Sequence, residues 1–316
     1  MYRENTSPAW VAASAAVMLA LTACGQSEAP GKDKATDATP VEASANASEP
    51  ATENSLGAII AAQPEEAKAR YVYRNPKETL EFFGIEPGMT VVEALPGGGW
   101  YTKILAPYLG VEGAVIGADY DQALFPLFGF FSEEALEAKK TWTTDWPERA
   151  AGWFDTPVAK IDAFQFGSMP SQLEGSVDAV LFIRALHNLA RFEGQGGFET
   201  TALEETLKAL KPGGIVGVVQ HMAPEDAADD WADGAAGYLK KSYVIATLEG
   251  AGLELVAESD INRNPKDQPT SDDIVWRLPP TLHGTKDNPE QAAINTAIGE
   301  SNRMTLLFRK PADSAP

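Results

Sequence analysis

Apolar positions along the chain form short continuous runs that alternate with longer amphipathic stretches, beginning near residue 56. The run MTVVEA, at residues 89–94, predicts a buried strand, and the following residues 99–110 have the apolar spacing of a helix. The same alternation continues to the end of the chain. We expect seven strands: residues 89–94, 113–120, 157–164, 176–183, 215–221, the end of 237–259, and 304–310.

The stretches between these strands predict helices. Residues 76–85 open with Pro76, and residues 198–214 end in Pro212 and Gly213, which are ordinary start and stop signals. Repeated β-α-β units with nearly continuous apolar strands favour an α/β fold with a doubly wound, mostly parallel seven-stranded sheet. Ligands of such sheets bind beyond the carboxyl ends of the strands, near the switch point beside the first strand.

Two segments exceed this minimal pattern and are interpreted as insertions. Residues 121–154 are rich in Phe and Trp, and residues 262–291 separate the last two strands. Each segment either covers exposed core or forms a lid and a substrate wall over a bound cofactor. The pattern alone leaves both possibilities open.

The N-terminus predicts export. Arg3 precedes an apolar run, Trp10–Ala23, which is shorter than the ~20 residues that a membrane-spanning helix needs. Residues 1–23 therefore fit a signal peptide. The run ends in LTAC, which resembles the bacterial lipobox. This resemblance implies a lipid on Cys24 and, with Gly25 next, a periplasmic location on the inner leaflet of the outer membrane.

Residues 24–55 contain Ala, Ser, Thr, Glu, Asp and Pro with almost no large apolar side chain. We expect a disordered tether there, followed by one domain at residues 56–316. The only membrane contact expected is through the Cys24 lipid. Cys24 is the single cysteine in the chain, so the domain itself has neither a free thiol nor a disulfide.

The composition and net charge of the chain limit the kinds of molecule that it can bind. Of the 316 residues, 44% are hydrophobic, which supplies a substantial core, and the formal net charge is −20. Such a charge repels phosphate backbones, and no block of Lys or Arg counters it, so we expect no nucleic-acid partner. A small-molecule substrate is the remaining expectation. The sequence leaves the oligomeric state open.

The first strand is followed by a glycine loop. Glu93 lies on the strand, and Gly97, Gly98 and Gly99 follow it. A dinucleotide-binding fingerprint would need another glycine at Thr102, so that match is weak. A loop without side chains lets the backbone approach a ligand closely.

Glu93 and the glycines resemble motif I of the class I S-adenosylmethionine-dependent methyltransferases, which is acid-x-Gly-x-Gly-x-Gly. Leu95 occupies the first glycine position and is followed by Pro96. The resemblance implies S-adenosylmethionine as cofactor. It also implies that Glu93 fixes the loop near the methionine ammonium group, while Gly97 and its two successors contact the cofactor.

Other segments extend the resemblance over about residues 76–224. Asp119 follows the second strand 20 residues after Gly99, where an acid can accept the two ribose hydroxyls; a helix-capping role is the alternative. LKPGG resembles the family's turn before the fifth strand. Asp162 and Phe164, after the third strand, are candidates for adenine contacts.

The wider run from residue 74 to residue 110 also resembles a group of exported methyltransferases with P-G-G-G-[WY]-[YF]-T in motif I. In that group Leu95 and Pro96 would be a subfamily feature. The resemblance supplies no substrate.

Histidines are the candidate catalytic bases. His187 follows the fourth strand and His221 ends the fifth, so both should lie at the ligand edge of the sheet. Structural roles are equally compatible with the pattern. Arg184 is either a clamp for a substrate carboxylate or a surface ion-pair partner, and His283 is either a gate or solvated. Trp100 and Tyr101 are expected to pack against the sheet. No spacing demands a metal.

These observations predict an S-adenosylmethionine-dependent methyltransferase that acts on a small, non-nucleic acceptor in the cell envelope. One alternative is a catalytically silent module with the same fold that binds a ligand or protein. This alternative arises because the cofactor is made in the cytoplasm. A nicotinamide oxidoreductase is disfavoured by Thr102 and by the lack of a Tyr-x-x-x-Lys pair after the fourth strand.

Overall fold

The computed structural model of the chain describes residues 55–312. The predicted signal peptide, Cys24 and the tether up to residue 54 lie outside these residues. The strands are β1 (Thr90–Ala94), β2 (Ala114–Asp119), β3 (Lys160–Gln165), β4 (Val177–Ile183), β5 (Leu210–Ala223), β6 (Leu239–Lys240), β7 (Glu254–Ser259) and β8 (Arg303–Arg309). The α-helices are α1 (Leu56–Ala61), α2 (Glu65–Lys68), α3 (Tyr71–Arg74), α4 (Pro76–Phe82), α5 (Thr102–Leu109), α6 (Glu133–Lys140), α7 (Trp142–Ala151), α8 (Leu186–Gly196), α9 (Phe198–Ala209), α10 (Lys241–Gly250) and α11 (Pro289–Ile298). Short 3₁₀ turns are η1 (Phe125–Phe128), η2 (Ser171–Leu173) and η3 (Val275–Arg277).

Seven of these strands are joined in the order β3-β2-β1-β4-β5-β8-β7, and β6 pairs with the end of β5. Neighbours from β3 to β5 run parallel, whereas β8 runs antiparallel to both β5 and β7. The chain reverses its direction of travel across the sheet between β1 and β4, which is the switch point. The predicted doubly wound, mostly parallel seven-stranded α/β fold is confirmed.

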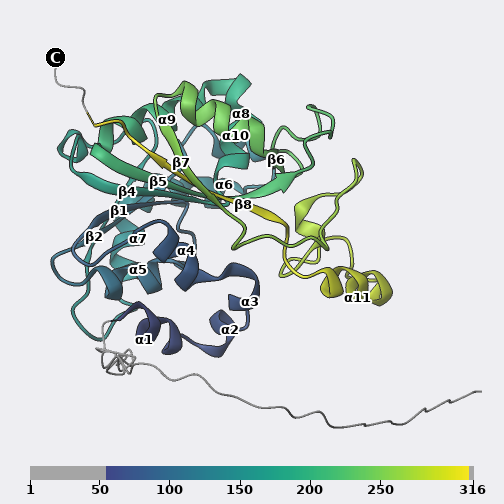
Figure 1. Cartoon of the computed structure of the whole chain (residues 1–316), viewed down its shortest axis with the longest axis horizontal. Helices are drawn as coiled ribbons and strands as arrows, with labels where there is room; N and C mark the ends of the chain where they lie inside the picture. Colours follow the sequence, from purple (N-terminus) through teal and green to yellow (C-terminus); the bar gives the residue numbers. More distant parts are fainter. Residues whose placement is uncertain (1–54, 313–316) are drawn as a thin grey trace, which may run out of the picture. The chain divides into compact units, whose positions relative to one another are not determined.

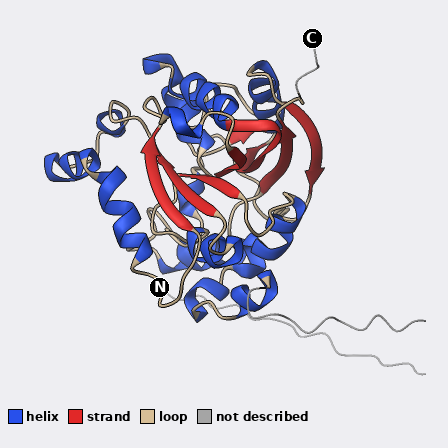
Figure 2. Ribbon diagram, turned by 90° about the vertical axis from the view of Figure 1, so that its left-hand side faces the viewer, coloured by secondary structure: helices blue, strands red, loops and turns tan. Residues whose placement is uncertain are grey.

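The sheet is buried on both faces, as continuous apolar strands require. On β1, Val91 packs into the core that includes residues of α1, α4 and α5, whereas the next residue, Val92, packs into the core with residues of α8, α9 and α10. Figure 1 shows these two helical layers on opposite sides of the strands, and Figure 2 shows the twist of the sheet between them. The carboxyl ends of β1, β4 and β5 therefore meet at one edge.

The segment at residues 121–154 is only partly an insertion. It contains α7, which lies between the parallel neighbours β2 and β3 and packs against β3. Parallel strands need such a crossover. Trp146 of α7 packs on Gly117 of β2, where a Cβ would lie 2.7 Å from the indole. The prediction of one continuous insertion is wrong for α7, and η1 and α6 are the additional elements.

Two local features add to the sequence pattern. Only two residues separate helix α8 from β4, and the pattern did not predict this helix. LKPGG lies where a turn was expected. Only Leu210 pairs with β4 before the pairing resumes at Ile215, and Gly213 in between has a φ angle of +78°. Pairing with β8 also begins at Ile215, so residues 211–214 turn the chain into the continuously paired part of β5.

Candidate functional site

The loop after β1 passes through left-handed backbone three times. The φ angles are +53° at Leu95, +53° at Gly97 and +75° at Gly99. These are the three positions that carry glycine in the methyltransferase motif described above. Glycine adopts this conformation freely, whereas a side chain there costs about 1–2 kcal/mol. Leu95 thus has a conformation that glycine would adopt at lower cost.

Neighbouring glycines of this loop have different surroundings. A Cβ placed on Gly98 meets no atom within 4 Å, and Gly98 lines two cavities. A Cβ on Gly99 would lie 2.0 Å from the ring of Trp153. Gly98 is therefore open to a ligand, whereas Gly99 allows Trp153 to pack on the loop.

Glu93 lies behind the loop and is 5% exposed. Its Oε2 accepts a hydrogen bond from Thr102 Oγ1 at 2.6 Å, which ties the end of β1 to the first turn of α5. Burial raises the pKa of the Glu93 carboxyl to about 7, against the opposing effects of Thr102 and of the Arg184 charge. Glu93 lines neither of the cavities that Gly98 lines. Its position suits the predicted role of fixing the loop, and the contact with a methionine ammonium group stays a prediction.

Asp119 ends β2, where a ribose acceptor was predicted, but its carboxylate already has partners. Oδ2 lies 2.6 Å from Nζ of Lys139 on α6, and Oδ1 accepts a hydrogen bond from the Tyr120 amide at 3.0 Å. Burial raises the pKa of Asp119, and Lys139 opposes this shift. The ribose role stays a prediction, and ribose hydroxyls would have to share or displace Lys139.

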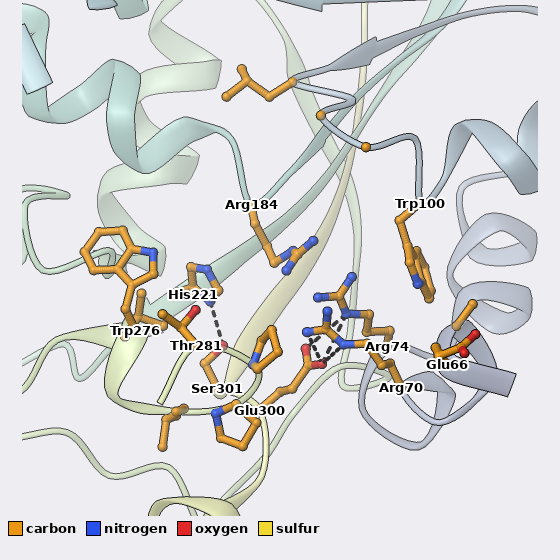
Figure 3. A pocket seen from close by; sticks show the side chains of 18 of the residues that line it. Glu66, Arg70, Arg74, Trp100, Arg184, His221, Trp276, Thr281, Glu300 and Ser301 are labelled. Carbon is orange, nitrogen blue, oxygen red and sulfur yellow. Dashed lines mark hydrogen bonds and ion pairs between the residues drawn. The ribbon is translucent and has the colours of Figure 1, made fainter. Parts of the chain in front are cut away.

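The first of three cavities at this edge is the arginine cavity, of about 680 Å³. Its walls come from the N-terminal helices, the glycine loop, the end of β4 and residues 275–281. Figure 3 shows Arg70, Arg74 and Arg184 in this wall, with Trp100 and Trp276 on opposite sides. The cavity is therefore cationic and aromatic.

Glu300 lies at the centre of a buried ion cluster in the wall of the arginine cavity. Its carboxylate is 2.6 Å from Nη2 of Arg70, 3.1 Å from Nε of Arg74 and 3.0 Å from Nη2 of Arg303. Arg70 and Glu300 are 230 positions apart in the chain. The cluster therefore fixes α3 against the start of β8.

Arg184 follows β4 in an unusual conformation. Its φ angle is +61°, and its amide donates to the Val219 carbonyl on β5 at 2.6 Å. Figure 3 shows its guanidinium pointing toward the Glu300 cluster. No carboxylate within residues 55–312 lies within 4.0 Å of that guanidinium, and the cluster's ion pairs belong to other arginines. Burial and the charge of Arg303 lower the pKa of Arg184 to about 10, so it remains cationic near neutral pH.

The second cavity, the tryptophan cavity, has a volume of about 700 Å³ and lies on the α7 side of the glycine loop. Gly97 and Gly98 line it together with Trp142, Trp146 and Trp153. The indole N–H of Trp146 donates to the Gly97 carbonyl at 3.2 Å. The loop thus separates the tryptophan cavity from the arginine cavity, and the same glycines line both.

The third cavity, the histidine cavity, measures about 630 Å³ and adjoins the arginine cavity. His187 and His221 both line it, with ring centres 5.5 Å apart. The structure therefore brings the two predicted histidines together at the carboxyl edge of the sheet. Leu95 and Arg184 line both adjoining cavities.

Both histidines are held in their neutral form. Gln220 donates its amide N–H to the Gly237 carbonyl at 3.0 Å, which leaves its Oε1 facing His187 Nδ1 at 3.4 Å. Burial lowers the pKa of His187 to about 4. His221 Nδ1 lies 2.6 Å from Ser301 Oγ, and burial together with His187 holds the pKa of His221 well below its ordinary value. Such imidazoles are weak bases but serviceable hydrogen-bond partners.

The two predicted adenine contacts are not brought to these cavities. Asp162 and Phe164 lie within β3 rather than after it. The Asp162 side chain is 54% exposed and pairs with Lys160 at 3.2 Å. Phe164 is buried in the core, 5.6 Å from Phe166 between ring centres. Neither side chain lines any of the three cavities.

Of the other residues that the sequence singled out, some line a cavity and one is buried in the hydrophobic core. Trp100 lines the arginine cavity, with the guanidinium of Arg74 4.8 Å from its ring centre, whereas Tyr101 is buried against the sheet as expected. His283 lines the histidine cavity. Trp276 and Thr281 line both of these cavities, so part of the segment at 262–291 contributes to their walls.

Sequence reasoning did not find the Glu300 cluster. Arg70 and Arg74 are one helical turn apart, which places them on one face and was a usable local signal. Nothing local connected them to Glu300 or to Trp276, because that connection depends on how distant segments meet.

Two further observations concern the described residues. Within residues 55–312, His, Cys, Asp and Glu side chains form no group of three or more that could hold a metal ion. Within the same residues, no helix is both long enough and apolar enough to cross a membrane.

Comparison with known proteins gives matches only at the level of structure. No protein-family model matches this chain. No curated protein matches it.

Three solved structures illustrate the structural likeness. The [4+2]-cyclase SpnF is 18% identical, over 76% of this chain and 80% of its own, with a TM-score of 0.46. A SAM-dependent methyltransferase from Aquifex aeolicus is 15% identical, over 78% and 98%, with a TM-score of 0.46. The arsenic(III) S-adenosylmethionine methyltransferase CrArsM from Chlamydomonas reinhardtii is 15% identical, over 81% and 73%, with a TM-score of 0.40. The strand order of the sheet, rather than these likenesses, establishes the fold.

Proposed function

We propose that this chain is an S-adenosylmethionine-dependent methyltransferase that acts on a small, non-nucleic acceptor in the cell envelope. The observation that carries the proposal is the loop after β1. Its three motif positions have left-handed backbone, and Gly97 and Gly98 face two cavities at the switch point of the sheet. The signal peptide, the Cys24 lipid and the exported subgroup enter the proposal from the sequence alone.

The residues present fit the cofactor on the loop side. The open space at Gly98 is a cradle that a side chain would fill. The indoles of Trp142 and Trp153 offer aromatic surface in the tryptophan cavity, where Asp119 lies behind Lys139. We assign the tryptophan cavity to the nucleoside part and the arginine cavity to the methyl acceptor.

The cofactor, when bound, supplies a methyl group on a sulfonium. The chain's own residues have to hold the acceptor in line with that methyl and exclude water, and such orientation alone provides effective molarities of ~10⁵ M or more. His187 and His221 are neutral and weakly basic, so they suit positioning by hydrogen bonds. An acceptor atom that arrives without a proton suits such a site, because no strong base is then needed.

The test is calorimetric titration of the purified full-length chain with S-adenosylmethionine and S-adenosylhomocysteine. We expect both to bind, and Gly98→Val to weaken binding at least about tenfold because its side chain fills the cradle. Gly194→Val is the matched control, since a Cβ there also meets no atom within 4 Å but Gly194 lies on α8, away from the loop. Asp119→Ala tests the ribose role. Absence of binding to either compound, with all variants alike, would refute the proposal.

A second candidate, the catalytically silent binding module, is favoured by one specific observation. Lys139 neutralises Asp119, the acid predicted to accept the ribose hydroxyls. If this pair has replaced cofactor binding, the wild-type chain will bind no S-adenosylhomocysteine, and Lys139→Gln will restore none. If the pair only competes with the ribose, the wild type will bind and Lys139→Gln will change the affinity.

A further inference from the structure

The arginine cavity carries more positive charge than its own side chains balance. Arg70, Arg74 and Arg303 share the single carboxylate of Glu300. Arg184 adds a fourth positive charge, and Figure 3 shows its guanidinium pointing toward this cluster. A buried charge without a partner is costly, and an anion in the cavity removes this cost.

Arg184 is placed to meet such an anion. Its amide is tied to Val219, so the backbone is fixed, and Figure 3 shows the guanidinium pointing into the cavity. The guanidinium is planar and donates in a fork that matches a carboxylate. Among the described residues 55–312, none supplies a carboxylate within ion-pair distance of it.

The rest of the wall suits an apolar body beside the anionic group. Trp100 and Trp276 face the cavity from opposite sides, and Leu278, Pro279 and Pro280 continue the wall. These side chains offer flat and aliphatic surface without charge. A ring or a short hydrocarbon attached to the anion would be buried there.

The charges of the wall beyond the arginines nearly offset each other. Glu66 lies at the exposed rim of the cavity, and Lys103 also lines it. Among the three arginines that line the cavity, Arg184 alone has no carboxylate within ion-pair distance in residues 55–312. One carboxylate is enough to pair with this single guanidinium, whose planar fork matches its two oxygens.

We propose that the arginine cavity binds a small organic acid, whose carboxylate pairs with Arg184 and whose apolar body lies between Trp100 and Trp276. This inference rests on the proposed function in one respect, namely that the acid is the methyl acceptor. The carboxylate positions the acceptor and forms or breaks no bond.

The test uses three compounds of one shape on the purified full-length chain. Benzoate carries the carboxylate, benzamide is its uncharged analogue, and phenyl phosphate carries a dianion. We expect calorimetry to show binding of benzoate, at least about tenfold weaker binding of benzamide, and a similar loss of benzoate affinity in Arg184→Gln. Arg309→Gln is the matched control, because it lies on β8 at the opposite end of the sheet and is exposed.

Arg184→Lys covers the case in which Arg184→Gln fails to fold. It keeps the charge and loses the planar fork, so benzoate affinity should fall by part of the loss expected for Arg184→Gln. Circular dichroism verifies the fold of each variant. No binding of benzoate at millimolar concentration, equal binding of benzamide, tighter binding of phenyl phosphate, or unchanged benzoate affinity in both Arg184 variants would each overturn the proposal.

Titration with S-adenosylhomocysteine separates this proposal from the proposed function. Benzoate binding that depends on Arg184, in a chain that binds no S-adenosylhomocysteine, would leave an acid-binding module and remove the methyltransferase. Binding of S-adenosylhomocysteine without benzoate binding would leave the methyltransferase and remove the carboxylate site.

Discussion

Glu93 illustrates how one buried carboxyl group makes the stability of the fold depend on pH. Its carboxyl is enclosed behind the loop with one hydrogen bond, from Thr102, and its pKa rises from 4.5 to about 7. The folded state therefore binds a proton more tightly than the unfolded state does. Ionisation of Glu93 costs stability as the pH rises from 4.5 to about 7, and the whole cost is present above that range.

The corresponding prediction concerns Glu93→Gln, which keeps an oxygen acceptor for Thr102 and cannot ionise. Between about pH 4.5 and about pH 8, the free energy of unfolding should shift by about 3 kcal/mol in favour of the variant, relative to wild type. Urea denaturation at several pH values measures this difference. Buried histidines titrate in both proteins, so their effect cancels.

The exposed Glu249→Gln change controls for the loss of a carboxyl group elsewhere on the chain. Parallel pH profiles for Glu93→Gln and wild type would show that the Glu93 carboxyl is not perturbed as described.

Leu95 shows what a local motif does and does not determine. The acid and glycines marked the end of β1 as a ligand-binding loop, and the structure places Gly97 and Gly98 in the walls of two cavities. The pattern also marked Leu95 as a departure, and only the structure shows that its backbone is left-handed as the glycine's would be. The amide of Leu95 donates to the Ala118 carbonyl at 2.7 Å, so β2 helps to hold that conformation.

At the scale of elements, the Glu300 cluster joins α3 to the start of β8. The side chains of Arg74, Arg303 and Glu300 are 4%, 2% and 5% exposed. Removing the negative charge leaves the buried arginines without compensation, which is much more costly than losing a surface pair.

We therefore predict that Glu300→Gln lowers the free energy of unfolding by about 3 kcal/mol or more. Amide hydrogens of α2 and α3 should also exchange faster, because these helices lose their attachment. Urea denaturation and hydrogen exchange measure the two effects. Glu258→Gln is the matched control: Glu258 pairs with Lys241, but both side chains are well exposed, and we expect a cost below about 1 kcal/mol. Equal costs for the two variants would contradict the prediction.

The helices and strands were predictable where the local pattern of apolar and polar residues reflects which side chains are buried. Apolar runs located the seven strands of the sheet path, and helix signals located α4, α5 and α9. The order of the strands was not predictable, because the insertion of β8 between β5 and β7 depends on pairing between distant residues. The same reason explains why α7 was mistaken for part of an insertion, and why the wall residue Trp276 was missed.

At the scale of the whole molecule, the net charge of the chain affects how an anion approaches the arginine cavity. The chain has a formal net charge of −20, yet the arginine cavity is positive. Surface acids repel anions at long range, and this repulsion is screened by salt over roughly 10 Å at 0.1 M. A small acid would thus reach the cavity more readily at moderate than at very low ionic strength.

The anchoring prediction concerns Cys24, which lies outside the described residues. We propose that Cys24 carries the lipid that holds the chain at the envelope, so Cys24→Ser should leave an unprocessed precursor. Inhibition of the lipoprotein signal peptidase should have the same effect on the wild type. Membrane fractionation with precursor size on a gel measures both. Normal processing and membrane association of Cys24→Ser would exclude the lipid anchor.

The sequence separation within the Glu300 cluster has a consequence for the timing of synthesis. Arg70 is among the first residues of the domain to be made, and Glu300 is among the last. A nascent chain therefore carries α2 and α3 for almost the whole of translation before their counter-charge exists. The arginine cavity is completed in a late step, and a ribosome-stalled chain that ends before residue 300 would have the glycine loop without a complete arginine cavity.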